Sequence, residues 1–144
     1  MTKEEKQLLL IDLCARLPYG VIVYHLDYNE PQTLNTIYYN SNAWQDGGAI
    51  QCNIDYVGNL PHDMCLCKPY LRSMSSMTAE EKKQYHKLCD VDEEYGVGCN
   101  PEIVAVHDTL ESLDYLNSIH IDYRGLIPQG LAIEVTEENN PYKD

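Results

Sequence analysis

The stretch from Cys65 to Cys89, CLCKPYLRSMSSMTAEEKKQYHKLC, marks the point at which the chain passes from strands to helices. Its first residues end an apolar run of strand type, and a basic, serine-rich segment follows. Thr78 and Glu81 then have the spacing of a capping box, in which each side chain bonds the other residue's backbone N–H at a helix start. The stretch therefore predicts a sheet before it and a helix over about 78–88 within it.

Upstream of this stretch, apolar and polar residues alternate with a period of two. The alternation begins at Val21, and turn signals rich in Gly, Pro and Asn separate the apolar runs. Because the connections are short, the pattern predicts four consecutive strands over about 21–71. These strands are expected to form a small antiparallel meander sheet or an open SH3-like barrel.

A helix is also predicted at the start of the chain. Thr2 and Glu5 form a capping box, and the apolar residues that follow recur at helical spacing. Pro18 and Gly20 then end the pattern. We therefore expect an amphipathic helix over residues 3–16 that covers the sheet.

The last third of the chain carries one more helix signal. Asp108 and Glu111 repeat the capping spacing and predict a helix over about 109–119. A short strand is expected near 131–135, and the acidic tail over 136–144 is expected to be frayed. Together with the preceding segments, this predicts an α+β fold with about three helices.

Length and composition indicate one globular domain over residues 1–144, with 44% apolar and 23% charged residues. Phe is absent and Tyr occurs 12 times, so aromatic packing depends on rings that also carry a hydroxyl group.

The net charge of −13 is concentrated at the C-terminal end. Residues 90–144 hold 13 acidic and 2 basic residues, a net charge of −11. A field of this sign repels phosphate backbones, so direct nucleic-acid binding is disfavoured. Basic protein surfaces, or mimicry of nucleic acid by the acidic segment, fit this charge better.

The apolar run LLLIDLCARL contains Asp12 and follows the mixed charges of KEEK, so it fits neither a signal peptide nor a membrane span. The expected location is the cytoplasm. The six cysteines are then expected to be thiols.

Two thiols and an imidazole suggest a possible metal site. In a strand Cys65 and Cys67 would point to the same face, and His62 precedes them by three residues. Structural zinc sites, however, usually pair ligands across two-residue spacers and repeat the pair elsewhere, which this chain does not do. We therefore expect buried cysteines, no metal and no cofactor, with a zinc protein as an alternative.

Catalytic motifs are absent from the sequence. The chain has no nucleophile elbow, P-loop, dinucleotide-binding glycine pattern or HExxH motif. The pair His120 and Asp122 resembles a fragment of a metal-dependent hydrolase motif but lacks the partner residues. A non-enzymatic protein is favoured, and an enzyme stays as an alternative.

Two groups of residues are candidate binding surfaces. The first is aromatic, because amphipathic rings in loops and on sheets are enriched at protein interfaces. Its members are Tyr38, Tyr39, Trp44 and Tyr56. The second group is basic with an aromatic ring and could bind a phosphate or nucleotide. Its members are Lys68, Tyr70, Arg72, Lys82 and Lys83. The aromatic rings could equally belong to the core, and the lysines could equally be a solvated helix face.

Three segments, LCARLPYGV, KPYLRSMSSMTAEEKKQY and DYLNSIHIDYRGLIPQGLAIEV, resemble a family of small proteins from gut Bacteroidales bacteria and their phages. No activity is assigned to that family, so the resemblance implies provenance alone: a phage or mobile-element accessory factor. The expected function is binding of a host or defence protein, in the host cytoplasm if a phage encodes the chain. The alternatives are sequestration of a signalling nucleotide, mimicry of nucleic acid, and a small zinc protein or enzyme.

Overall fold

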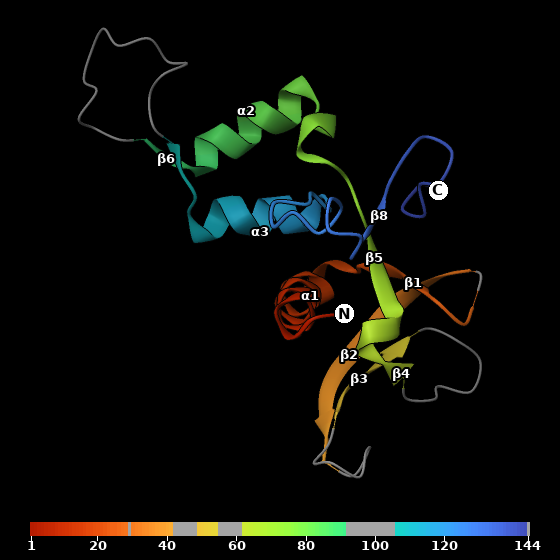
Figure 1. Ribbon diagram of the computed structural model, residues 1–144. Coiled ribbons are helices and arrows are strands. Elements are labelled where there is room, and N and C mark those ends of the chain that lie inside the picture. The colour runs from red at the N-terminus through yellow and green to blue at the C-terminus, as the bar shows by residue number, and fades with distance from the viewer. Residues whose placement is uncertain (29, 42–48, 55–61, 92–105, 144) are drawn as a thin grey trace, which may run out of the picture.

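The computed structural model describes residues 1–28, 30–41, 49–54, 62–91 and 106–143 (Figure 1). It confirms the α+β fold with three helices and an open sheet. The helices are α1 (Lys3–Arg16), α2 (Ala79–Leu88) and α3 (Leu110–Ser118). The strands of the main sheet are β1 (Ile22–His25), β2 (Pro31–Asn40), β3 (Ala49–Ile54), β4 (His62–Asp63), β5 (Cys67–Leu71) and β8 (Ile133–Glu134).

Capping boxes begin all three helices, as local sequence predicts for two of them. Thr2 with Glu5 and Thr78 with Glu81 make both reciprocal bonds of the motif. The prediction for α3 was wrong by one residue, because Thr109 is the N-cap and its partner is Ser112. Asp108, the expected cap, instead accepts hydrogen bonds from the side-chain hydroxyls of Tyr85 and Ser112 and so links α2 to α3.

The sheet is strongly bent. Its strand order is β4-β3-β2-β1-β5-β8, so β4 and β5 are four places apart, yet only the 3₁₀ turn η2 (Met64–Leu66) joins them. Three residues span at most about 10 Å, whereas four strand spacings in a flat sheet cover about 19 Å. The Sγ atoms of Cys52 on β3 and Cys67 on β5 accordingly lie 3.5 Å apart. The fifth strand thus returns to pair with the first, and the five strands curl while the sheet stays open.

The sixth strand makes the sheet mixed. β8 pairs in parallel with β5, with Tyr70 opposite Ile133 and Leu71 opposite Glu134. A parallel neighbour needs a long crossover, and α2 and α3 lie on that crossover. The antiparallel pairing predicted over about 21–71 is confirmed, and the short strand predicted near 131–135 adds one parallel strand to it.

The core lies between α1 and the concave side of the bent sheet (Figure 1). Leu9 and Leu13 of α1 have no exposed surface and pack with Val21 and Val23 of the first strand region and with Leu71 of β5. A second cluster, formed by buried Met77, Leu116 and Ile121, lies where α3 meets α2.

α2 is a peripheral helix without a buried residue of its own. Tyr85 and Leu88 of α2 are half-buried and Ala79 is exposed, while Cys89 just after the helix is buried. Polar contacts hold the C-terminal end of α2 in place. The Thr109 hydroxyl donates to the Leu88 carbonyl oxygen at 2.6 Å, and β6 (Asp90–Val91) pairs with β7 (Val106–His107).

The curled sheet predicts a pattern of thiol reactivity. We expect Cys14, which is exposed, to be alkylated in the folded protein, and Cys52 and Cys67, which have no exposed surface, to stay protected. Brief treatment with iodoacetamide followed by peptide mass spectrometry measures this, with urea-unfolded protein as the control in which all three react. Equal rates at the three thiols in folded protein would show that the sheet does not close as described.

Candidate functional site

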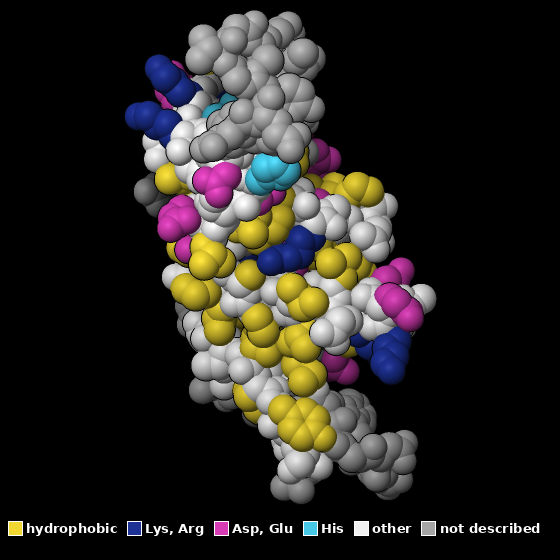
Figure 2. Space-filling model, turned by 90° about the vertical axis from the view of Figure 1, so that its left-hand side faces the viewer, with side chains coloured by type: hydrophobic (Ala, Val, Ile, Leu, Met, Phe, Trp, Pro, Cys, Tyr) yellow, Lys and Arg dark blue, Asp and Glu magenta, His cyan; other side chains and the backbone are white. Residues whose placement is uncertain are grey.

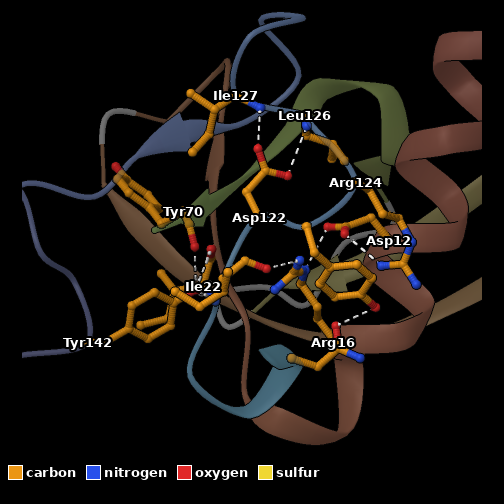
Figure 3. Close-up of polar contacts among 12 residues, drawn as sticks. Asp12, Arg16, Ile22, Tyr70, Asp122, Arg124, Leu126, Ile127 and Tyr142 are labelled. Carbon is orange, nitrogen blue, oxygen red and sulfur yellow. Dashed lines mark hydrogen bonds and ion pairs between the residues drawn. The ribbon is translucent and has the colours of Figure 1, made fainter. Parts of the chain in front are cut away.

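Two charged side chains lie inside the apolar face of α1. Asp12 and Arg16 have no exposed surface, and they follow Leu9 and Leu13 at the spacing that places all four on one face of the helix. The Arg16 Nε atom donates to Asp12 Oδ2 at 2.8 Å (Figure 3). Burial of a charged pair costs desolvation energy, so these groups need further hydrogen bonds from the rest of the chain.

Those bonds come from the segment after α3. Arg16 Nη2 donates to the carbonyl oxygen of Ile121 at 2.6 Å, and Arg124 Nη1 donates to Asp12 Oδ1 at 2.9 Å. The ring of Tyr123 lies against both guanidinium groups. Its centroid is 4.4 Å from the Cζ atom of Arg124 and 5.4 Å from the Cζ atom of Arg16. We call Asp12, Arg16, Tyr123 and Arg124 the ionic centre. It joins the first helix to residues more than a hundred positions later.

Asp122 organises the same segment without joining the ionic centre. Its two carboxylate oxygens accept the backbone N–H groups of Leu126 and Ile127, each at 2.9 Å (Figure 3). Its own N–H donates to the Arg72 carbonyl oxygen at 2.8 Å. Both carboxylate oxygens of Asp122 therefore bond backbone N–H groups of a turn. His120, two residues earlier, contacts a different side chain.

That partner is Tyr142, which holds the C-terminal segment. The Tyr142 hydroxyl accepts from the Ile22 N–H at 3.0 Å and donates to the Tyr70 carbonyl oxygen at 2.9 Å. Its ring stacks on the imidazole of His120 with centroids 3.7 Å apart and an interplanar angle of 9°. The tail over 136–144 was expected to be frayed, and among its described residues, up to 143, Tyr142 anchors it to the sheet. No local sequence pattern indicates this anchor, because its contacts are all distant in the chain.

His120 combines backbone strain with an unsatisfied nitrogen. Its φ angle of 63° lies in the left-handed region, where residues other than glycine are uncommon. Its Nδ1 atom is buried without a hydrogen-bond partner, as is Nη1 of Arg16. Burial, with the positive charges of Arg16 and Arg72 nearby, lowers the pKa of His120 to about 4. Burial raises the pKa of Tyr142, because it disfavours the charged phenolate.

The predicted phosphate-binding residues fall into different environments. Tyr70 is buried, and Lys68 is half-buried within the sheet. Arg72 already makes a bidentate ion pair with Glu81, at 2.8 and 2.7 Å, and donates to the Ser76 carbonyl oxygen. These bonds lower the pKa of Glu81 to about 2. Lys82 and Lys83 are exposed on α2, so of the five residues only these two are fully open to a ligand.

The predicted metal ligands do not share one strand. Cys65 lies in η2, and Cys67 opens β5 and points into the core beside Cys52. The backbone of His62 belongs to β4, and its side chain lies outside what the structure describes. Within the described ranges, no three or more His, Cys, Asp or Glu side chains are close enough to hold a metal ion.

The aromatic candidates are placed only in part. Tyr38 is half-buried and Tyr39 is 61% exposed near the end of β2, while Trp44 and Tyr56 lie outside the described residues.

The ionic centre was not identified from the sequence, although one signal could have revealed it. Asp12 and Arg16 interrupt an otherwise apolar stripe four residues apart, which places an acid and a base together on the side facing the core. The partners Tyr123 and Arg124 have no comparable signal.

We expect Arg16→Met to destabilise the fold by about 3–5 kcal/mol, because it leaves Asp12 and the Ile121 carbonyl oxygen in the interior without this donor. Urea unfolding measures the change. The matched control is Lys6→Met on the same helix, which is exposed and should change stability by less than about 0.5 kcal/mol. Similar effects of the two substitutions would contradict a structural role for the ionic centre.

The lowered pKa of His120 predicts a pH dependence of stability. Between its ordinary value of 6.5 and about 4, the unfolded chain binds a proton at this residue and the folded chain does not. The free energy of unfolding should therefore fall as the pH drops through this window. The stability that the Glu81 ion pair contributes is lost at a lower pH, as the pH falls from 4.5 to about 2.

The variant His120→Asn tests this assignment, because Asn also tolerates a positive φ but does not titrate. Urea midpoints across the window should depend less on pH in the variant than in the wild type. Parallel pH profiles of the two proteins would rule out His120 as the titrating group.

No known family model, curated protein or solved structure matches the chain. None of the described helices has the length and apolar character needed to cross a bilayer. The function is therefore argued from the geometry and charge of the described surface.

Proposed function

We propose that the protein is a small non-enzymatic binding protein that docks on a partner protein through the outer face of α1. The observation that carries this proposal is an open groove of about 480 Å³ on that face. It is lined by Lys3, Glu4, Gln7, Leu8 and Ile11. Ile11 is 46% exposed, so an apolar side chain lies at the outer surface of a helix whose other face is in the core.

The surroundings of the groove support a protein interface. α1 and the end of β2 form the left edge of the lower half of the molecule in Figure 1, and the left-hand side faces the viewer in Figure 2. A band of hydrophobic side chains runs over this face, with only scattered charged groups within it. Tyr39 on β2 is the most exposed aromatic side chain among the large hydrophobic residues of the described chain. Apolar centres with aromatic anchors are typical of protein interfaces.

Charge supports the chemistry of the partner. With a net charge of −13, the protein attracts surfaces of opposite sign and repels acidic ones. The proposed partner therefore presents apolar residues to the outer face of α1 and carries a net positive charge, which the acidic residues of 90–144 attract. On the resemblance to phage and Bacteroidales proteins, that partner would be a host or defence protein in the cytoplasm.

Surface docking fits the structure better than catalysis within the ionic centre. Asp12 and Arg16 have no exposed surface, so a substrate has no access to them in the folded protein. The groove on α1 is accessible, and the described residues that line it include Lys3 and Glu4 but no His or Cys. Its apolar side chains, Leu8 and Ile11, suit contact with a protein surface.

The test combines a cross-link with a matched pair of variants. A photoreactive amino acid at position 11 of the full chain should capture the partner in host cells, and the partner is then purified and its affinity measured. Ile11→Glu should weaken binding about tenfold or more, because a charge enters the apolar contact. Leu110→Glu, an equally drastic change at a 79% exposed position on α3, is the control and should leave affinity unchanged.

Binding should also weaken as salt is added, because opposite charges steer the complex. If Ile11→Glu and Leu110→Glu weaken binding equally, or if neither weakens it, the outer face of α1 is not the docking surface.

A further inference from the structure

One side chain fastens the C-terminal segment to the rest of the molecule. Among the described residues from 136 to 143, hydrogen bonds to residues before 134 are made by the Tyr142 hydroxyl alone. The other bonds are local, such as those of Thr136 with Asn139 and of Asn139 with the Glu134 carbonyl oxygen. The side chains of residues 136–139 are exposed. The segment is thus a strap with a single anchor.

The anchor occupies a slot with two kinds of wall. The flat wall is the imidazole of His120, parallel to the phenol ring at 3.7 Å. The polar end consists of one donor, the Ile22 N–H, and one acceptor, the Tyr70 carbonyl oxygen. Figure 3 shows the hydroxyl pointing between these two backbone groups.

The polar end is a break in a β-ladder. The pairing of β1 with β5 ends at Val23 opposite Pro69, and at the next position the Tyr142 hydroxyl bridges Ile22 and Tyr70. A hydroxyl both accepts and donates, so it satisfies both strands at once. An apolar ring in the same place would leave a buried donor and a buried acceptor unpaired, which is costly.

The wall of the slot carries a nitrogen that Tyr142 does not use. Nδ1 of His120 is buried without a hydrogen-bond partner. The left-handed backbone at His120 is the kind of strain that gathers at ligand sites.

We propose that this slot is a binding site for a hydroxyaryl group, and that Tyr142 is its occupant within the chain. A free phenolic compound, or a tyrosine side chain of another peptide segment, then competes with the strap for the same stacking wall and the same two backbone groups. This site is separate from the groove on α1, and neither proposal depends on the other.

The experiment uses the full chain with Tyr142→Ala, which empties the slot and keeps every wall. Addition of p-cresol should raise its melting temperature by about 2–4 °C in a concentration-dependent manner, because a ligand that binds only the folded state stabilises it. Toluene, which has the ring without the hydroxyl, should have a much smaller effect. Wild-type protein, whose slot is filled, should respond less than the variant to p-cresol.

A second arm distinguishes the two sources of the hydroxyaryl group. A short peptide with the sequence Asn-Pro-Tyr-Lys is compared with its Phe counterpart on the same variant. Stabilisation by p-cresol alone assigns the slot to small phenols, and stronger stabilisation by the Tyr peptide assigns it to a peptide segment. Either result supports the site.

If Tyr142→Ala is largely unfolded, the same titrations are followed by circular dichroism as recovery of folded protein. Recovery with p-cresol but not with toluene is then the supporting result. Equal responses to p-cresol and toluene would show that the slot is only an apolar cavity without recognition of the hydroxyl group, and would also overturn the proposal. No response to p-cresol or to the Tyr peptide, in either form of the experiment, would overturn the proposal.

Discussion

The burial of Arg16 is the constraint on which the rest of the structure depends. A guanidinium group without exposed surface is tolerated only where the chain supplies a carboxylate and a carbonyl oxygen at fixed positions. Asp12 supplies the first from the same helix, and Ile121 supplies the second from the far end of the sequence. The helix that covers the bent sheet and the segment that follows α3 are thereby held in one arrangement.

From the Ile121 region the order extends in two directions. Toward the sheet, Asp122 bonds the backbone of Arg72 at the end of β5, and the side chain of Arg72 continues to Glu81 on α2. Toward the C-terminus, Asp122 fixes the turn that leads to β8, and His120 receives Tyr142. Polar groups therefore connect elements whose hydrophobic contacts form two clusters, one under α1 and the other between α2 and α3.

The features that were predictable from sequence are local ones. The capping boxes at Thr2 and Thr78 and the alternation after Val21 act over a few residues, so they indicate helices and strands directly. The return of β5 to β1, the parallel strand β8 and the anchoring of Tyr142 rest on partners far apart in the chain, and no local pattern encodes them. The cap of α3 shows the limit at short range: Asp108 and Thr109 were both suitable caps, and Asp108 is instead bonded by Tyr85. The candidate binding residues could be chosen from sequence by residue type, but their exposure could not be predicted. Tyr39 is exposed and Tyr70 is buried because of tertiary packing.

The junction of α2 and α3 has a consequence for how the protein opens locally. The Thr109 to Leu88 hydrogen bond and the pairing of β6 with β7 hold one end of the helix pair, and the cluster of Met77, Leu116 and Ile121 lies where the two helices meet. α2 has no buried residue of its own and therefore depends on these contacts. Because the core under α1 is a separate cluster, α2 and α3 form a local unit that can open while that core stays intact.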